Sequence, residues 1–412
     1  MNQKAGLGIS LFLPDGVTPN AFAVLASRSL RAFADGYIAV LLPVYLLSIG
    51  LNTLQVGITA TATMLGSALA TVAVGAWGHR FASRRLLQAA ALLMVVTGAG
   101  FAVLSSFGAL LVVAFVGTLN PSSGDVSVFL PLEHTRLAAS ASGHARTSLF
   151  ARYSVLGTSF AAIGALAAAL PQWLTAHLQM PPQPALRSMF ALYGALGLLV
   201  WWLYRRPGAE TASTESDRAA PLGPSRSVVV RLAALFSVDA FAGGLIVNAL
   251  LALWLLQRLG LTPAQAGVFF FWSGLLSAAS QLAAPLVARR FGLLNTMVFT
   301  HIPSNVCLVL AALAPGAPLA IGFLLVRSAL SQMDVPTRTA YVMAVVTPAE
   351  RSAAASFTAV PRSLAAAVSP TLSGALFALG WASLPLIACG VLKTAYDLVL
   401  WKACRRDVLR DR

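Results

Sequence analysis

Residues 46–57, LLSIGLNTLQVG, are matched 210 positions later by residues 256–267, LQRLGLTPAQAG. Both copies have leucine at the first place, a Gly-Leu pair at the fifth and sixth, glutamine at the tenth and glycine at the last. A near-constant offset of this kind predicts two like-oriented halves. It continues over more than 100 residues, through Ser67–Ala68 with Ser277–Ala278, Arg80–Phe81 with Arg290–Phe291, Arg152 with Arg362 and, at an offset of 209, Asp125 with Asp334.

The composition is that of a membrane protein. Of the 412 residues, 58% are hydrophobic and only 10% are charged, with a mean hydropathy of +0.79. Soluble domains carry about 25% charged residues, so the bilayer is the expected solvent. The chain has room for about twelve helical spans of roughly 20 residues. We expect them near residues 22–49, 54–77, 86–106, 109–131, 147–171, 186–203, 228–257, 263–288, 293–314, 318–346, 353–379 and 382–401.

One long polar stretch interrupts this pattern in the middle of the chain. Residues 204–227, YRRPGAETASTESDRAAPLGPSRS, are typical of a flexible linker. We therefore predict an all-α polytopic membrane protein with twelve transmembrane helices in two pseudo-symmetric six-helix bundles. The N-terminal bundle spans residues 1–203, the cytoplasmic linker residues 204–227, and the C-terminal bundle with a short cytoplasmic tail residues 228–412.

Basic residues are distributed unevenly between the two sets of loops. With the N-terminus inside, 19 of the 28 Lys and Arg residues fall in cytoplasmic segments, whereas the opposite loops hold only Arg187 and Arg258. This is the positive-inside pattern, and it predicts that both termini are cytoplasmic and that the protein lies in the cell inner membrane. The net charge of +15 is spread over many loops that face lipid headgroups, so we expect no nucleic-acid partner.

The residue types that metal sites and enzymes need are scattered. The three cysteines and five histidines show no metal-ligand spacing, and a phosphate-binding G-x-x-x-x-G-K-[ST] motif is absent. We therefore expect no metal, no cofactor and no enzymatic activity. The alternatives to a transporter from other functional classes are a membrane-embedded enzyme and a substrate-sensing receptor.

The chain resembles the major facilitator superfamily. The signature of that family between helices 2 and 3 is Gly-x-x-x-Asp-Arg-x-Gly-Arg-Arg, and residues 75–85 read GAWGHRFASRR. Gly75, Arg80 and Arg84 fit it, whereas His79 replaces the usual aspartate. The second copy, PLVARRFGLLN, keeps Arg290. The resemblance implies that Arg80, Arg84 and Arg290 belong to a gate.

The same resemblance implies that helices 1, 4, 7 and 10 line a central cavity. In this chain those helices contain Asp35, Asp125, Asp239 and Asp334, together with Asn120 and Asn248. Charged residues within a membrane are costly and usually face water or one another. A buried carboxylate can also take up and release protons. We therefore assign these six residues to a substrate and proton path.

Helix 10 contains the densest group of charges. At 100° per residue, Arg327, Asp334, Arg338 and Tyr341 fall within roughly 40° of one direction, and Asp334 precedes Arg338 by the four residues that suit an ion pair. We expect Pro336 to kink this helix. The stripe is either part of the cavity, which we favour, or a static ion pair that fixes helix packing.

Arg152 and Arg362 form a pseudo-symmetric pair with two interpretations. In the family, such arginines sometimes clamp solutes that bear phosphate or carboxylate groups. Alternatively they are a latch in which Arg152 pairs with Asp125 and Arg362 with Asp334, and we favour the latch. We expect Lys393 to be structural, because helix 12 usually stays outside the cavity in this family.

The sequence thus predicts a monomeric secondary transporter that moves a small polar solute by alternating access with proton coupling. The arginines favour an anionic solute. Its partners would be the lipid bilayer, the small-molecule substrate and protons. The alternative is an exporter of drugs or toxic compounds by proton antiport, although the family's antiporter pattern on helix 5 is not visible in LGTSFAAIGALAAALP.

Overall fold

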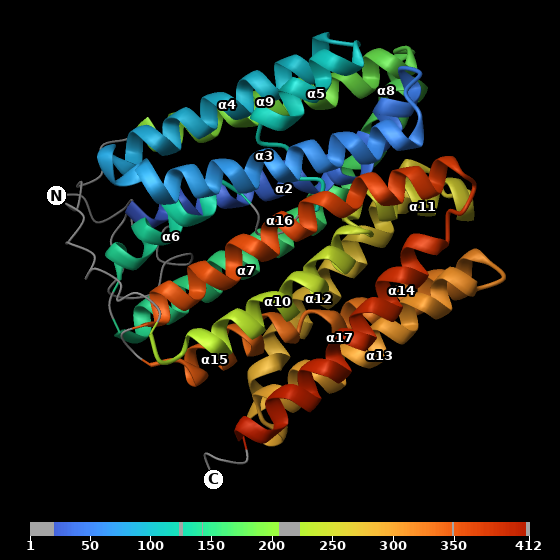
Figure 1. Cartoon of the computed structure of the whole chain (residues 1–412). Coiled ribbons are helices and arrows are strands. Elements are labelled where there is room, and N and C mark those ends of the chain that lie inside the picture. Colours follow the sequence, from blue (N-terminus) through green and yellow to red (C-terminus); the bar gives the residue numbers. More distant parts are fainter. Residues whose placement is uncertain (1–19, 123–126, 142, 206–222, 348–349, 409–412) are drawn as a thin grey trace.

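The computed structural model describes residues 20–122, 127–141, 143–205, 223–347 and 350–408, and within these ranges all regular structure is helical (Figure 1). The helices are α2 (Asn20–Ser48), α3 (Thr53–Trp77), η1 (Gly78–Arg80), α4 (Ser83–Val103), α5 (Phe107–Val116), α6 (Phe129–Ser140), α7 (Gly143–Leu166), η2 (Ala167–Ala169), α8 (Leu170–Leu178), α9 (Pro182–Arg205), α10 (Arg226–Gly244), α11 (Asn248–Leu259), α12 (Pro263–Phe291), α13 (Leu293–Leu313), α14 (Ala317–Ser331), α15 (Asp334–Val345), α16 (Arg351–Ala378) and α17 (Leu384–Val408).

Nine stretches of the described residues are helices long and apolar enough to cross a membrane. The three remaining predicted spans are the α5–α6 pair, the α14–α15 pair and the single helix α16. Together they give the twelve spans expected from the sequence, arranged as two six-helix bundles. The predicted fold class is therefore confirmed. The boundary between the bundles stays a prediction, because residues 206–222 lie outside the described ranges.

The repeated sequence builds the same turn and helix start twice. Gly50 and Gly260 have φ of +89° and +68°, the left-handed conformation that glycine adopts at little cost. Asn52 and Thr262 then cap α3 and α12. Each accepts a hydrogen bond from the backbone N–H three residues on, at Gln55 and Gln265, whose side chains bond back to the cap. This capping box explains why glutamine recurs in both copies.

The last glycine of each copy lies where the two bundles touch. A Cβ on Gly57 of α3 would come within 2.5 Å of the Pro370 carbonyl oxygen on α16, and one on Gly267 of α12 within 2.4 Å of the Ala165 carbonyl oxygen on α7. Next to the first contact, the hydroxyls of Thr61 and Thr371 are 2.8 Å apart. The repeat therefore also specifies the two faces through which the bundles join.

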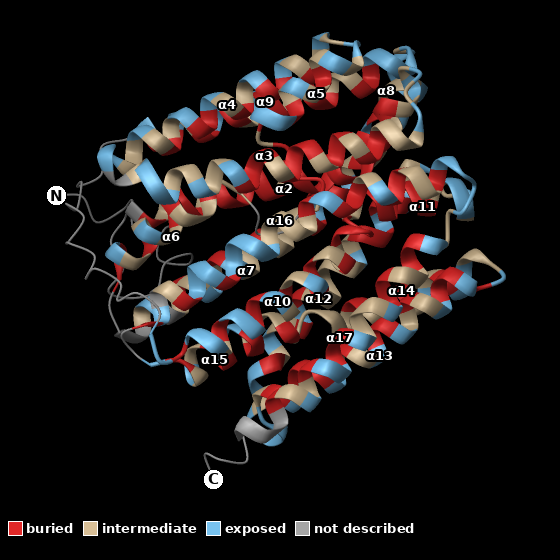
Figure 2. Cartoon of the chain, in the orientation of Figure 1, coloured by how far each residue is buried: buried red, intermediate tan, exposed pale blue. Residues whose placement is uncertain are grey.

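The buried side chains form one shared core and two separate ones. The largest cluster joins both bundles, with Tyr37 and Phe190 from one and Trp254 and Phe270 from the other. Figure 2 shows this burial where α2, α3, α11 and α16 meet. At the end where α2 begins and α17 ends, each bundle has its own cluster, around Phe129 in the first and Phe236 in the second. Among the described residues, the core shared by the two bundles thus lies away from the end where α2 begins.

The fourth span, expected near residues 109–131 with a bend at Pro121, is interrupted between two helices. Helix α5 ends at Val116 and α6 begins at Phe129. Pro121 has no N–H and disfavours helix in the residue before it. The freed backbone groups find partners nearby: the Thr118 carbonyl accepts from the Tyr193 hydroxyl at 2.9 Å, and the Pro121 carbonyl accepts from the Ala249 N–H at 2.9 Å. The second bond crosses to α11, at a break in the seventh span.

The tenth span is also broken, slightly before the predicted position. Helix α14 ends at Ser331 and α15 begins at Asp334, so the interruption lies at Gln332 and Met333. Pro336 is the third residue of α15, in the first turn, where a missing N–H leaves no helical bond unmade. The proline therefore begins a new helix and does not bend an existing one.

Candidate functional site

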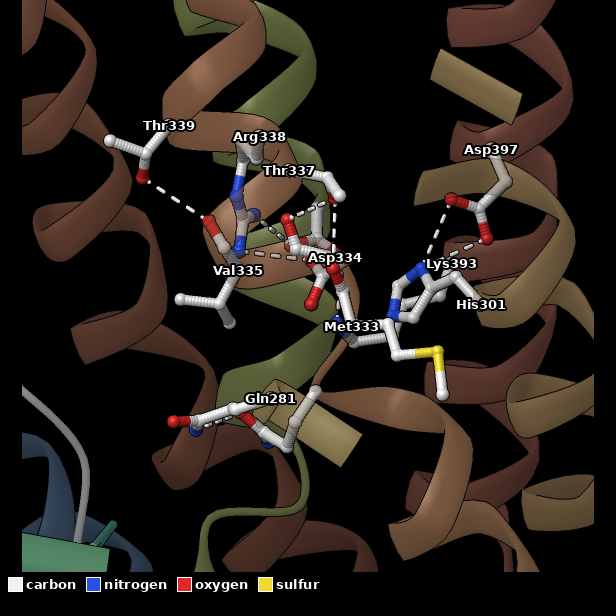
Figure 3. Close-up of polar contacts among 12 residues, drawn as sticks. Gln281, His301, Met333, Asp334, Val335, Thr337, Arg338, Thr339, Lys393 and Asp397 are labelled. Carbon is white, nitrogen blue, oxygen red and sulfur yellow. Dashed lines mark hydrogen bonds and ion pairs between the residues drawn. The ribbon is translucent and has the colours of Figure 1, made fainter. Parts of the chain in front are cut away.

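Four charged side chains form a buried network in the C-terminal bundle. Asp239 of α10 lies between two cations: its Oδ2 is 3.0 Å from Nη1 of Arg338 on α15, and its Oδ1 is 2.6 Å from Nζ of Lys393 on α17. Asp334 pairs with the same arginine at 3.0 Å (Figure 3). The side chains of these residues are at most 12% exposed. The network therefore binds three helices through charges removed from water.

The broken helix explains how Asp334 and Arg338 reach this network. Asp334 is the first residue of α15, where the unpaired N–H groups of a helix start favour a carboxylate. One turn later, Arg338 extends to both Asp334 and Asp239. The intrahelical pair expected from the spacing is present. Tyr341 is buried one turn further along α15.

Arg362 of α16 lies beside the network without joining it. Its electrostatic neighbours include Arg338, Asp239 and Asp334, yet its side chain is exposed. Among the described residues Arg362 forms no ion pair with Asp334, which is engaged by Arg338 instead. A pocket of about 550 Å³ is lined by Arg226 and by a stretch of α16 that ends at Pro361, the residue before Arg362.

A second buried network ties together four helices of the N-terminal bundle. Glu133 of α6 has no exposed surface. Its carboxylate oxygens accept from Arg31 of α2 at 2.6 and 2.5 Å, from the Tyr153 hydroxyl of α7 at 2.5 Å and from the Tyr204 hydroxyl of α9. The Arg31 guanidinium also lies 3.9 Å from the ring centre of Phe129. Every strong acceptor position of this carboxylate is thus used.

The predicted path residues of the N-terminal bundle have varied surroundings. Asp35 is buried on α2, one turn after Arg31. Asn120 is buried in the break between α5 and α6, where its Oδ1 accepts from the Ser122 hydroxyl at 2.7 Å. Asp125 lies outside the described residues, so the predicted Arg152–Asp125 latch does too. Arg152 itself is half-buried on α7.

Two predicted residues of the C-terminal bundle lie at helix breaks or away from the network. Asn248 is half-buried and begins α11. Arg327 of α14 is half-buried, with the thiols of Cys307 and Cys389 among its neighbours. Since the break at Gln332 and Met333 separates α14 from α15, Arg327 does not continue the stripe of Asp334 and Arg338 as one regular helix would.

The three predicted gate arginines have different surroundings. Arg80 ends η1 and is exposed. Arg84 of α4 donates to the carbonyl oxygens of Tyr204, at 3.1 Å, and Arg205, which are the last carbonyls of α9. Arg290, at the end of α12, is exposed with its guanidinium 5.7 Å from the ring centre of Phe291. Arg84 thus caps a helix within its own bundle.

Several contacts of the buried charged residues were not predicted from the sequence. Lys393, expected to be structural, contacts Asp239. On α13, His301 and Asn305 bind Asp397 of α17 at 3.0 Å each. A charged residue in an apolar span signals such a site, but the partner on a distant helix cannot be read from spacing. In the described part of the chain, no group of three or more His, Cys, Asp or Glu residues could hold a metal ion.

Comparison with known proteins agrees with this geometry. The family model described as Major Facilitator Superfamily matches residues 24–333 of this chain. The chain belongs to the major facilitator superfamily. It is a multi-pass membrane protein of the transporter type. The uncharacterized membrane protein YJR124C of Saccharomyces cerevisiae is 23% identical over 410 residues, which cover 91% of this chain and 92% of that protein.

Solved structures share the fold at low sequence identity. A bacterial homolog of the human lysosomal transporter Spinster, in an inward-facing state, has a TM-score of 0.73 at 14% identity and covers 94% of this chain and 97% of its own. The xylose transporter XylE from E. coli, inward open, has a TM-score of 0.71 at 15% identity, with coverage of 93% and 96%. The nucleoside transporter NupG has a TM-score of 0.71 at 13% identity, with coverage of 93% and 99%.

Proposed function

We propose that this member of the superfamily is a proton-coupled secondary transporter of the cell inner membrane that moves a small polar solute, preferentially an anion. Its two bundles would rock about a site near the middle of the membrane. The end where α2 begins and α17 ends would face the cytoplasm, which the distribution of Lys and Arg supports. We further propose residues 1–203 and 228–412 as the two moving units.

The division of the apolar core is the observation that supports alternating access best. The two bundles share one buried cluster, whereas each has a cluster of its own at the proposed cytoplasmic end. With the proposed orientation, this arrangement supports an inward-facing state. Separating Gly57 from Pro370 and closing the other end would produce the opposite state.

The preference for an anion rests on Arg362. The buried network beside it is balanced within itself, since Asp239 and Asp334 face Arg338 and Lys393. Arg362 is exposed, and Pro361, the residue before it, lines a pocket. An exposed guanidinium binds carboxylate or phosphate through paired hydrogen bonds. Arg152 occupies the matching place in the N-terminal bundle and would be its counterpart.

Proton coupling is assigned to one or more of Asp35, Asp125, Asp239 and Asp334. The structure describes three of them, and all three are buried. A carboxylate in such surroundings binds and releases protons with a change in nearby charge. Because Asp334 and Asp239 share Arg338, a proton on either would release this arginine to the other.

Uptake into proteoliposomes with an imposed pH gradient tests the proposal. Sugars, nucleosides, organic anions and amphipathic drugs would be compared, with Asp334→Asn as the matched variant. We expect uptake of a small polar solute that follows the gradient and is lost in the variant. Transport of amphipathic drugs alone would favour the exporter. Equal transport by Asp334→Asn would remove this residue from the path.

A further inference from the structure

A histidine and an aspartate form a buried pair outside the four aspartates of the proposed path. His301 of α13 lies with Nδ1 3.0 Å from Asp397 of α17, and Asn305, one turn after His301, donates from Nδ2 to Asp397 Oδ2 at 3.0 Å. Asp397 has no exposed surface, and His301 and Asn305 are 4% and 1% exposed. Both donors come from one helix and both acceptors belong to one carboxylate, so the geometry is fixed by helix packing.

The hydrogen bonds determine where a proton would bind. With its hydrogen on Nδ1, the His301 ring donates to Asp397, and Nε2 is the nitrogen with a free lone pair. Asn305 holds the second carboxylate oxygen and thereby orients Asp397 toward the ring. A proton added at Nε2 would give an imidazolium that keeps its bond to Asp397.

Counting the buried charges shows what such a proton would change. Asp239, Asp334 and Asp397 are three buried carboxylates; Arg338 and Lys393 pair with the first two, Arg362 lies beside those two, and the ion-pair partner of Asp397 is His301. Asp397 is therefore the buried carboxylate that lacks a charged partner while His301 is neutral. Burying an unbalanced charge is unfavourable, and a proton on His301 removes the imbalance.

The other charged and titratable groups that neighbouring helices bring near the buried network are Arg362, Arg327 and Tyr396. Arg362 faces the network from α16 but is exposed. Arg327 of α14 has the thiols of Cys307 and Cys389 as neighbours. Tyr396, the residue before Asp397, is buried and neighbours Asp239 and Arg338.

Lys393 connects the pair to the proposed path. It lies four residues before Asp397 on α17, and its Nζ contacts Asp239 of α10. Residues four apart on a helix are neighbours, so Lys393 has two carboxylates within reach. While His301 is protonated, Asp397 is neutralised and Lys393 stays on Asp239. When His301 is neutral, Asp397 attracts Lys393 and weakens its contact with Asp239.

We propose that His301 and Asp397, oriented by Asn305, form a proton-binding site at the rear of the C-terminal bundle that selects the carboxylate partner of Lys393. Figure 3 shows the His301 ring directed at Asp397, and α13, which contains His301, packs against both α14 and α15. The site is thus placed to act on the break in the tenth span. The role of this site depends on the proposed transport cycle, whereas the experiment that tests the site does not require transport.

The test needs no substrate. Spin labels at Ala82→Cys and Arg289→Cys, which are exposed and outside the predicted gate, in a Cys307→Ala background, would report the separation of the two bundles at the end where α2 begins, in lipid nanodiscs between pH 5 and 8. We expect the two distance populations to exchange with pH in the otherwise unaltered protein. This dependence should be lost in His301→Gln and Asp397→Asn, and kept in His177→Gln, which alters an exposed histidine at the opposite end.

A second variant, Lys393→Met, and the ¹⁵N spectrum of the His301 ring distinguish loss of the proton site from misfolding. Lys393→Met leaves the pair intact and should remove the response to pH, while the ¹⁵N signals of His301 still titrate. A pH response that survives in His301→Gln, or its absence in the unaltered protein, would overturn the site. Failure to find a transported solute would bear on the proposed function alone, whereas pH-driven uptake unchanged in His301→Gln would remove the proton site and leave the transporter.

Discussion

Glu133 is a carboxylate with no exposed surface, and it is stable there because every contact compensates its charge. Arg31 supplies the opposite charge, and the Tyr153 and Tyr204 hydroxyls supply the remaining donors. Isolated charges are very unfavourable in apolar surroundings, whereas fully bonded pairs are tolerated. At the scale of single residues, each buried charge therefore also holds helices together.

Replacing Glu133 with glutamine leaves Arg31 buried without its counterion. We expect Glu133→Gln to lower the free energy of unfolding by about 3–5 kcal/mol, measured by denaturant unfolding in detergent. Arg290→Gln, at an exposed arginine, is the control and should change it by less than about 0.5 kcal/mol. Equal stability of the two variants would mean that the network contributes little.

Glu350 should make the stability of the folded protein depend on pH in a defined direction. Hydrogen bonds from the Ser225 and Thr347 hydroxyls, each 2.6 Å long, and from the Gly223 N–H lower the pKa of Glu350 to about 2. A lowered pKa stabilises the folded state above the unfolded pKa of about 4.3. The contribution of Glu350 to stability is lost as the pH falls from about 4.3 through about 2.

We therefore expect the stability difference between the unaltered protein and Glu350→Gln to be constant above pH 5 and to shrink between about pH 4.3 and pH 2. Thermal unfolding in detergent at stepped pH measures it. A difference that stays the same down to pH 2 would contradict the lowered pKa.

Charges in apolar spans revealed part of the site. Asp239, Asp334 and Arg338 stand out by hydropathy alone, and the spacing of four residues predicted the Asp334–Arg338 pair that is found. The partners Lys393 and Asp397 could not be predicted, because hydropathy places a residue in a span without giving the direction it faces. Those contacts depend on helix packing between distant segments.

At the scale of helices, the breaks matter as much as the spans. Apolar composition predicted the spans near 109–131 and 318–346 but not their interruptions. The interrupted backbone around Thr118 and Pro121 is satisfied by Tyr193 and Ala249, which are remote in the sequence. A pattern of local residues cannot reveal such compensation. Pro336 signalled the neighbourhood of one break, although the break precedes it.

The contact between α3 and α16 predicts unequal effects of two glycine substitutions on one helix. Gly57→Ala would place a Cβ 2.5 Å from the Pro370 carbonyl oxygen, whereas Gly75→Ala finds nothing within 4 Å. Overpacking costs about 1–3 kcal/mol, and alanine in open helix gains up to about 1 kcal/mol over glycine. We expect Gly57→Ala to unfold at a lower temperature than the unaltered protein and Gly75→Ala at an equal or higher one. The reverse order would show that the helices are not in tight contact.

At the scale of the whole molecule, the repeat near residues 46–57 and 256–267 predicted the duplicated architecture. The repeat did not predict at which end the two bundles pack together. Packing determines that, through one core shared by both bundles and separate cores at the end with the termini. A molecule whose bundles share a core at one end and have separate cores at the other is suited to two states.

Paired distance measurements at both ends test this account most directly. One label pair, Ala82→Cys with Arg289→Cys, reports the end where α2 begins, and the other, His177→Cys with Arg258→Cys, reports the opposite end; all four sites are exposed. In nanodiscs we predict two populations in which one distance lengthens as the other shortens. Two fixed distances, or distances that change in the same direction, would contradict alternating access.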